Sequence, residues 1–168
     1  MRVDRERRER RRSLPHPSRR FAPSGAHPTI RRSVTALATI PLFEGLSKRD
    51  LRRLAEEADV VRFERGRPIV VEGERGEAMF VMLSGSAKVV RGRRTVATVM
   101  PGDFFGELSA LDDGPRTASV VPETPVEVLR LFRHTLRRLV EREPALALRM
   151  LQGLAHRLRH VRPGEPVG

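Results

Sequence analysis

The chain has 168 residues, of which 39% are hydrophobic, and carries a formal net charge of +12. This length allows one domain plus a tail. The absence of cysteine excludes disulfides, thiolate metal sites and thiol catalysis. No apolar run approaches the roughly 20 residues needed to span a bilayer, and the N-terminus lacks the apolar core of a signal peptide. We therefore expect a cytoplasmic protein with no membrane partner.

The charge is concentrated in residues 1–33, where eleven arginines face three acidic residues, a net +8 of the total +12. The segment also holds four prolines and few large apolar residues. Such a composition cannot bury enough surface to offset its ordering entropy, so we predict a disordered basic tail. The alternatives are an arm for nucleic acid or an acidic membrane, or a wrongly assigned start codon. The predicted domain covers 34–162, and 163–168 is predicted to be a disordered C-terminus.

The first predicted elements are a lead-in helix over 33–40 and an amphipathic helix over 48–58. Ser47 is a suitable N-cap for the second helix, and leucines and alanines follow at helical spacing. From 59 to 131 the pattern changes to short apolar runs separated by glycines, at 69–71, 79–83, 87–89, 96–100, 118–121 and 126–131. Short strands at this spacing predict an antiparallel barrel or jelly roll.

The last part of the chain is predicted to be helical. A short helix covers 136–140, and Pro144 begins a longer one. Its apolar residues alternate by four and three, at Ala147, Leu151, Leu154, Leu158 and Val161. This seam could pack on the barrel or on a second copy, giving a homodimer. The predicted fold class is mainly β with flanking α: an antiparallel β-barrel (jelly roll) with an N-terminal helix and C-terminal lid helices.

The strands are interrupted over 103–116. The segment reads as a glycine turn, a short helix start, a Gly-Pro turn and a strand start that carries Arg116. A buried arginine needs an anionic partner, and its planar fork matches the oxygens of a phosphate. Glu107, acceptor-only when ionised, can receive a hydroxyl. A carboxylate for a sugar hydroxyl and a guanidinium for a phosphate indicate a nucleotide site.

This segment resembles the phosphate-binding cassette of cyclic-nucleotide-binding domains, found in the catabolite activator family, kinase regulatory subunits and nucleotide-gated channels. The resemblance is carried by Phe105-Gly106-Glu107-Leu108-Ser109 and Arg116-Thr117-Ala118. The glycines Gly73, Gly76 and Gly85 upstream match the same family pattern. The resemblance covers roughly 36–162.

The resemblance implies cyclic AMP or cyclic GMP as the ligand, with no metal. It implies that Glu107 accepts the ribose 2′-hydroxyl, that Arg116 pairs with the cyclic phosphate and that Thr117 adds a hydroxyl. Backbone N–H groups would come from Gly106, Glu107, Leu108 and Ser109. Val89, Val96 and Val99 would wall the base, and the final helix would act as a lid.

The main departure from the family is at the base. The chain has no Tyr or Trp to cap it, so the lid would use Leu154, His156, Arg157, Leu158 or His160. In the catabolite activator family a Thr near the end of this helix reads the adenine amino group. Its place here falls near Val161, which has no polar group to do so.

The sequence predicts a sensor and not an enzyme. A metal cupin needs ligands that converge from strands, and none of His16, His27, His134, His156 and His160 lies on a predicted strand. Ligand binding would tighten the cassette and redock the C-terminal helices. About six residues follow Arg162, too few for a helix-turn-helix, so output would pass to an unknown effector protein or through self-association.

Two alternatives remain open at this point. The barrel could retain the cassette without binding a ligand. The chain could instead be a nucleic-acid-binding protein that acts through its arginine-rich tail, with a vestigial barrel. We do not expect nucleic acid as a partner of the folded domain, since residues 34–168 carry only the remaining +4 of the +12.

Overall fold

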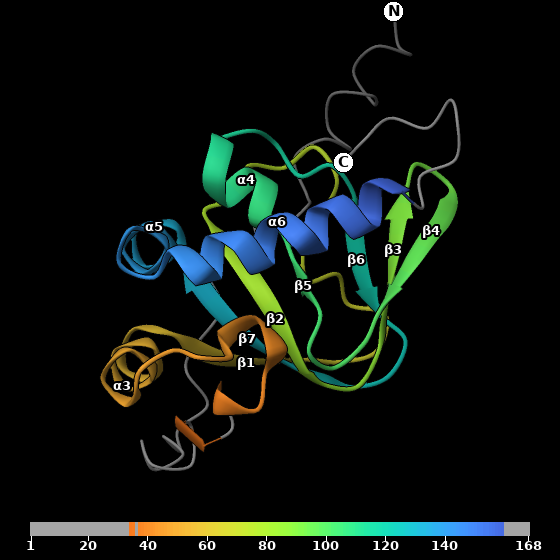
Figure 1. Cartoon of the computed structure of the whole chain (residues 1–168). Helices are drawn as coiled ribbons and strands as arrows, with labels where there is room; N and C mark the ends of the chain where they lie inside the picture. The colour runs from red at the N-terminus through yellow and green to blue at the C-terminus, as the bar shows by residue number, and fades with distance from the viewer. Residues whose placement is uncertain (1–33, 36, 160–168) are drawn as a thin grey trace, which may run out of the picture.

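The computed structural model describes residues 34, 35 and 37–159 (Figure 1). The two predicted tails, part of the lead-in helix, and His160 and Val161 lie outside the described residues. Among the described helices, none combines the length and the hydrophobicity that a membrane span requires.

The strands form two antiparallel sheets, which confirms the predicted fold class. One sheet has four strands in the order β1-β7-β2-β5, and the other has three in the order β4-β3-β6. The bounds are β1 Asp59–Phe63, β2 Ala78–Ser84, β3 Ala87–Arg91, β4 Arg94–Val99, β5 Phe104–Phe105, β6 Ser119–Pro122 and β7 Val126–Phe132.

The predicted strand at 79–83 forms most of β2, a central strand of the larger sheet that is buried on both faces. Side chains alternate between faces along a strand. Met79 and Val81 therefore belong to the core beneath the helices, whereas Phe80 and Met82 belong to the core between the two sheets. This explains why the run is apolar throughout instead of alternating with polar residues.

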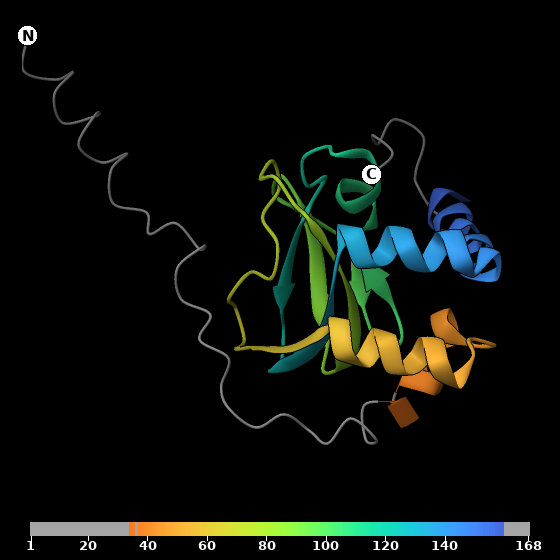
Figure 2. The same cartoon turned by 90° about the vertical axis from the view of Figure 1, so that its left-hand side faces the viewer.

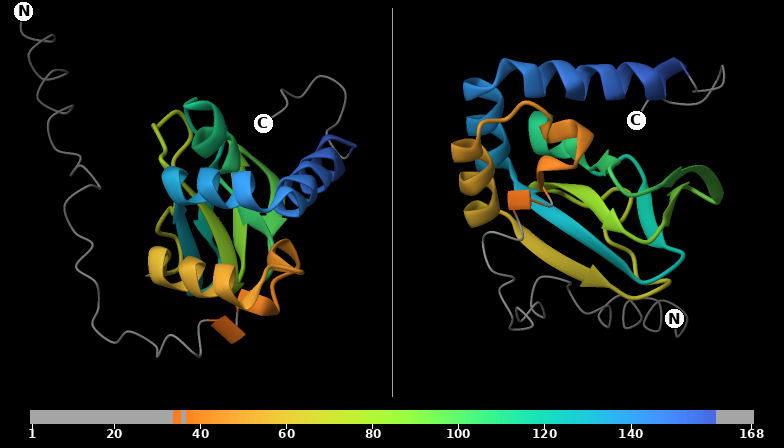
Figure 3. Two further views of the ribbon diagram at one scale, coloured as in Figure 1. Left: turned by 60° about the vertical axis from the view of Figure 1, so that its left-hand side comes forward. Right: turned by 60° about the horizontal axis from the view of Figure 1, so that its bottom comes forward.

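The helices cover one side of the larger sheet. They are η2 Pro41–Phe43, α3 Lys48–Glu57, α4 Glu107–Asp112, α5 Arg133–Arg142 and α6 Pro144–Arg159. In α3 the Ser47 hydroxyl accepts a hydrogen bond from the Asp50 backbone N–H at 3.1 Å, so the predicted N-cap is confirmed. Figure 2 shows α3 and α5 side by side, and Figure 3 shows α6 crossing the end of the molecule.

Two predicted features differ in the structure. The run at 69–71 forms a single bridge, Val70 to Val120, and not a strand. It belongs to a loop that β6 holds by a few hydrogen bonds, such as Ile69 N–H to Val120 O at 2.8 Å. These bonds are too few for a ladder, because Pro68 and Gly73 bend the chain on either side.

The apolar residues predicted to form one seam along α6 do not share one environment in the structure. Leu151 and Leu158 are exposed, Ala147 and Leu154 are partly buried, and the core contacts come instead from Leu146 and Met150. The reason is that α6 packs on η2 and α5 at one end, so the side facing the core is set by those neighbours.

Candidate functional site

A cavity of about 420 Å³ lies between the three-stranded sheet, the β5–α4 segment and α6. It falls within the range of small-molecule sites, roughly 300–1,000 Å³. The structure brings all the predicted site residues to its lining: Gly106, Glu107, Leu108, Ser109, Arg116 and Thr117. We call residues 105–118 the cassette.

The cassette begins where β5 ends. Gly106 has a φ of 75°, a left-handed conformation that glycine adopts without penalty, and it is the N-cap of α4. The turn places Glu107 in the first turn of α4, 2% exposed. Backbone N–H groups in the first turn of a helix have no partner within the helix. Apart from the Glu107 N–H, which bonds to the carboxylate of the same residue, those of the first turn of α4 can bind an acceptor in the cavity.

Arg116 enters the same cavity and is 7% exposed, so its predicted burial is confirmed. It does not lie at a strand start as predicted, because β6 begins only at Ser119. The prediction that it needs an anionic partner is not met by the protein itself. Its guanidinium instead donates to Gly106 O and Ala78 O, each at 2.8 Å, and lies 5.7 Å from the Phe80 ring centroid. These bonds fix the orientation of the guanidinium. The other N–H donors among its five remain available to a ligand.

Two glycines make room for this side chain. A Cβ at Gly76 would lie 2.1 Å from Arg116 Cζ, and a Cβ at Gly106 would lie 2.5 Å from Arg116 Nη1. Both distances are far below van der Waals contact. The glycine pattern therefore has a steric basis: without it the guanidinium could not lie where it does.

Glu107 is paired with the final helix. Arg157 Nη1 donates to Glu107 Oε1 at 2.6 Å, and the same guanidinium bonds to Phe104 O and lies 4.7 Å from the Phe104 ring centroid. Burial raises the pKa of Glu107, against the opposing effects of Arg157, its own backbone hydrogen bond and Arg116. Burial likewise lowers the pKa of Arg116, against the charge of Glu107. The cavity thus holds two buried charged groups.

Residues 60–143 match the family described as "Cyclic nucleotide-binding domain". The chain belongs to the cyclic nucleotide-binding domain family. It is 36% identical over 128 residues to the "CRP-like cAMP-activated global transcriptional regulator" of Mycobacterium tuberculosis, covering 73% of this chain and 57% of that protein.

Two solved structures are similar to this domain. The catabolite activator protein of Thermus thermophilus has a TM-score of 0.64 at 36% identity, covering 71% of this chain and 58% of that one. A cyclic nucleotide-binding domain from Methylobacillus flagellatus has a TM-score of 0.66 at 28% identity, covering 80% and 81%. The chain thus spans little more than half the length of the transcriptional regulator and of the activator protein.

Strands β3 and β4 give the cavity of this cyclic nucleotide-binding domain a mostly apolar outer end, to which Arg91 and Thr98 add two polar side chains. Val89, Val96 and Val99 line it as predicted. Among the lid candidates, His156 and Arg157 line it, but Leu154 and Leu158 do not. The prediction was wrong for these two leucines: Leu154 is partly buried outside the cavity and Leu158 is 48% exposed. His160 and Val161 lie outside the described residues.

The final helix approaches the cavity closely at Gly153. A Cβ there would lie 2.8 Å from Phe104 Cζ. The glycine in the middle of α6 is therefore explained by this close contact. This approach is what brings Arg157, one helical turn later, to Glu107.

The far end of the cassette is held by α5, a contact that sequence reasoning missed. Asp113 ends α4 with a φ of 64°, the one positive φ outside glycine in the described residues. It forms ion pairs with Arg133 and, at 4.0 Å, Arg137. Arg133 Nη2 also donates to Ser109 O at 3.0 Å and to Gly76 O at 3.2 Å. The arginine-rich sequence around 133–142 looks like a solvated helix face, so no local signal indicates this role.

In the part of the chain that the structure describes, no three His, Asp or Glu side chains gather as metal ligands. His134 and His156 lie on α5 and α6, not on strands.

Proposed function

We propose that this domain binds a cyclic purine nucleotide, cyclic AMP or cyclic GMP, in the cassette cavity and acts as a sensor. One observation carries the proposal. A buried carboxylate, Glu107, and a buried guanidinium, Arg116, line one cavity and form no ion pair with each other. Burying charged groups is costly unless they have partners. Glu107 has such a partner in Arg157, but Arg116 bonds only to two backbone carbonyls and lacks an anionic one. A ligand with an anionic group would supply the partner that Arg116 lacks, and its hydroxyl could bond to the second carboxylate oxygen of Glu107.

In the proposed binding mode, Arg116 receives the cyclic phosphate through the N–H donors that Gly106 O and Ala78 O leave unused. Glu107 accepts the ribose 2′-hydroxyl on the carboxylate oxygen that Arg157 does not occupy. Thr117 and the backbone N–H groups of Gly106, Leu108 and Ser109 complete the phosphate and sugar contacts. The Mycobacterium relative is named as cAMP-activated, which supports this ligand class.

We further propose that α6 transmits the response. Because Arg157 binds the same carboxylate as the ribose in this mode, a ligand changes the contact between α6 and the cassette. Binding would then shift the equilibrium between two positions of α6, provided that the ligand prefers one of them. The receiving partner is an unidentified effector protein or a second copy of the chain.

The outer face of α6 supports self-association. Leu148, Leu151 and Leu158 are 57%, 61% and 48% exposed, at spacings of three and seven. Leucines at this spacing form a seam suited to helix pairing. Analytical ultracentrifugation of wild type and Leu151→Lys tests the homodimer, which a monomeric wild type at high micromolar concentration would contradict.

Isothermal titration with cyclic AMP and cyclic GMP tests the function itself. We expect saturable one-site binding by the wild type and by Arg65→Ala, a control at an exposed arginine that does not line the cavity. The absence of binding by a folded wild type would favour a ligand-free barrel. The nucleic-acid alternative is not favoured, since the matched region is the domain and not the tail. The cytoplasmic location remains a prediction.

A further inference from the structure

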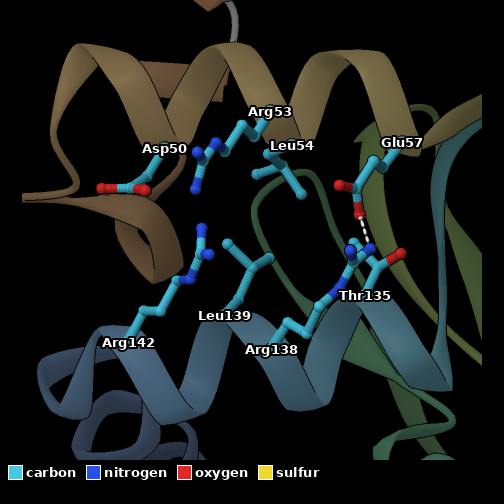
Figure 4. Close-up of a pocket in the computed structure, with 8 residues that line it drawn as sticks. All are labelled: Asp50, Arg53, Leu54, Glu57, Thr135, Arg138, Leu139 and Arg142. Atoms are coloured by element: carbon cyan, nitrogen blue, oxygen red, sulfur yellow. Dashed lines mark hydrogen bonds and ion pairs between the residues drawn. The ribbon is translucent and has the colours of Figure 1, made fainter.

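A second cavity, of about 290 Å³, lies between α3 and α5 and shares no lining residue with the cassette cavity (Figure 4). Leu54 and Leu139, both buried, contribute its apolar surface. The other lining residues are polar or charged: Asp50, Arg53, Glu57, Thr135, Arg138 and Arg142.

The charges in this pocket are not balanced by pairing. Arg138 forms an ion pair with Glu57 at one end. At the other end the Asp50 carboxylate points away from the centre in Figure 4 and accepts a hydrogen bond from the Ser47 hydroxyl. The guanidiniums of Arg53 and Arg142 point toward each other between these ends, and neither forms an ion pair within the described residues.

Two facing guanidiniums repel each other, and solvent screening reduces this repulsion without removing it. An arginine on a helix surface normally turns to water or to a neighbouring carboxylate. Here one guanidinium comes from each helix and the two meet above an apolar floor. An oxyanion between them would turn the repulsion into attraction, because each planar fork can donate two parallel hydrogen bonds to it.

An independent observation lies at the Arg138 end of the pocket. Thr135 is 2% exposed and its hydroxyl has no hydrogen-bond partner in the described structure. A buried polar group without a partner is rare in folded proteins. In Figure 4 Thr135 lies beside Arg138 and Glu57, whereas Arg53 and Arg142 face each other nearer the Asp50 end. The hydroxyl therefore marks an unfilled polar position in the same pocket and is not a donor to an anion between those two arginines.

We propose that the pocket between α3 and α5 binds one oxyanion group, a carboxylate or a phosphate, between Arg53 and Arg142. The occupied site would join α3 to α5, the helix whose Arg133 and Arg137 hold the cassette. The proposal does not depend on nucleotide binding, since the two cavities share no residue.

The test is a titration of isotope-labelled protein with inorganic phosphate, followed by the NMR signals of the arginine Nε–Hε groups. We expect saturable shifts of the Arg53 and Arg142 signals. Following these two residues separates the pocket from any phosphate bound by Arg116. Arg53→Gln and Arg142→Gln should each weaken binding at least tenfold. Arg52→Gln, on the exposed side of α3 outside the pocket, should change it less than twofold.

A hexaglutamate peptide distinguishes a free anion from a carboxylate presented by a protein. Peptide binding ten times tighter than phosphate, with the same dependence on Arg53 and Arg142, would indicate an acidic protein segment. Equal or weaker peptide binding would indicate a small anion. Thermal unfolding of each variant checks the fold, and Arg142→Lys, which keeps the charge but not the fork, should weaken binding about threefold. The proposal is overturned by unsaturable shifts, or by wild-type affinity in the Gln variants.

Discussion

The two ends of the cassette cavity differ in burial and in chemistry. At the inner end Glu107 and Arg116 are buried and held by defined partners, Arg157 for the first and two backbone carbonyls for the second. At the outer end the lining is mostly valine, with Arg91 and Thr98 as the polar side chains of β3 and β4, and Val96 is 38% exposed. In the proposed mode the inner end recognises the ribose and phosphate shared by all cyclic nucleotides. The outer end has few groups to tell one base from another.

The largest effect is expected for Arg116→Ala, which removes the proposed phosphate partner. Truncating one member of a buried charged pair costs about 2–5 kcal/mol, a roughly 30- to several-thousand-fold loss of affinity. Isothermal titration with both nucleotides measures it. The fold should survive, as judged by circular dichroism. A variant that binds like wild type would remove Arg116 from the site.

Glu107→Gln is expected to weaken nucleotide binding while raising the melting temperature. Losing the charged acceptor of a hydroxyl costs about 1.5–3 kcal/mol, or roughly 10- to 100-fold in affinity. Burial raises the pKa of Glu107 in the folded protein above its ordinary value. The folded state is therefore more stable while Glu107 is protonated, and it loses this stability as the pH rises through the folded-state pKa. The neutral variant should therefore melt higher than wild type at pH 7.

The pH dependence gives a control for this second prediction. The difference in melting temperature between Glu107→Gln and wild type should close below the ordinary pKa of 4.5, where both side chains are neutral. Glu56→Gln, at an exposed position of α3, should show no such difference. If Glu107→Gln instead melts lower at pH 7, the ion pair with Arg157 outweighs the cost of burial.

Arg133→Gln is expected to have a moderate effect on the inner end. It removes the bonds to Ser109 O and Gly76 O and the ion pair with Asp113. Since the cassette would lose part of its support without losing a proposed ligand contact, we expect roughly three- to tenfold weaker nucleotide binding, about 1 kcal/mol. Glu141→Gln on the same helix is the control. Unchanged affinity would show that α5 does not position the cassette.

The outer end predicts weak selectivity, within about tenfold or about 1.4 kcal/mol, between cyclic AMP and cyclic GMP. Apolar walls discriminate poorly between bases, whereas buried hydrogen-bonding groups do so strongly. Thr117 could favour cyclic GMP, since in related channel and kinase domains a Thr here can meet the guanine amino group of a syn base. Titrations of wild type and Thr117→Ala decide this. A hundredfold preference would mean a polar base reader beyond those described, such as His160.

The smallest effect is expected for deletion of residues 1–33. The composition of this segment predicts a tail that cannot pack, so nucleotide affinity and melting temperature should both remain within error of wild type. The same deletion tests the nucleic-acid alternative, because a salt-dependent DNA mobility shift should vanish with the tail if that alternative holds. A large loss of nucleotide affinity would show that the tail contacts the cavity.

Features that depend on neighbours along the chain could be predicted from the sequence. The Ser47 cap and leucine spacing predicted α3, and the apolar run at 79–83 predicted most of β2. The cassette motif predicted which residues meet in the cavity. Caps, turns and side-chain periodicity act within a few residues, so they can be read without knowing the fold.

Contacts between distant parts of the chain could not be predicted in this way and became visible only in the folded structure. Arg157 bonds to Glu107 across 50 positions, and Arg133 bonds to Ser109 across 24. Nothing local distinguishes these arginines from the many others in this basic chain. Their roles, like the core-facing side of α6 and the facing guanidiniums of Arg53 and Arg142, follow from how the helices pack. A long flexible side chain takes its partner from whatever the packing brings within reach.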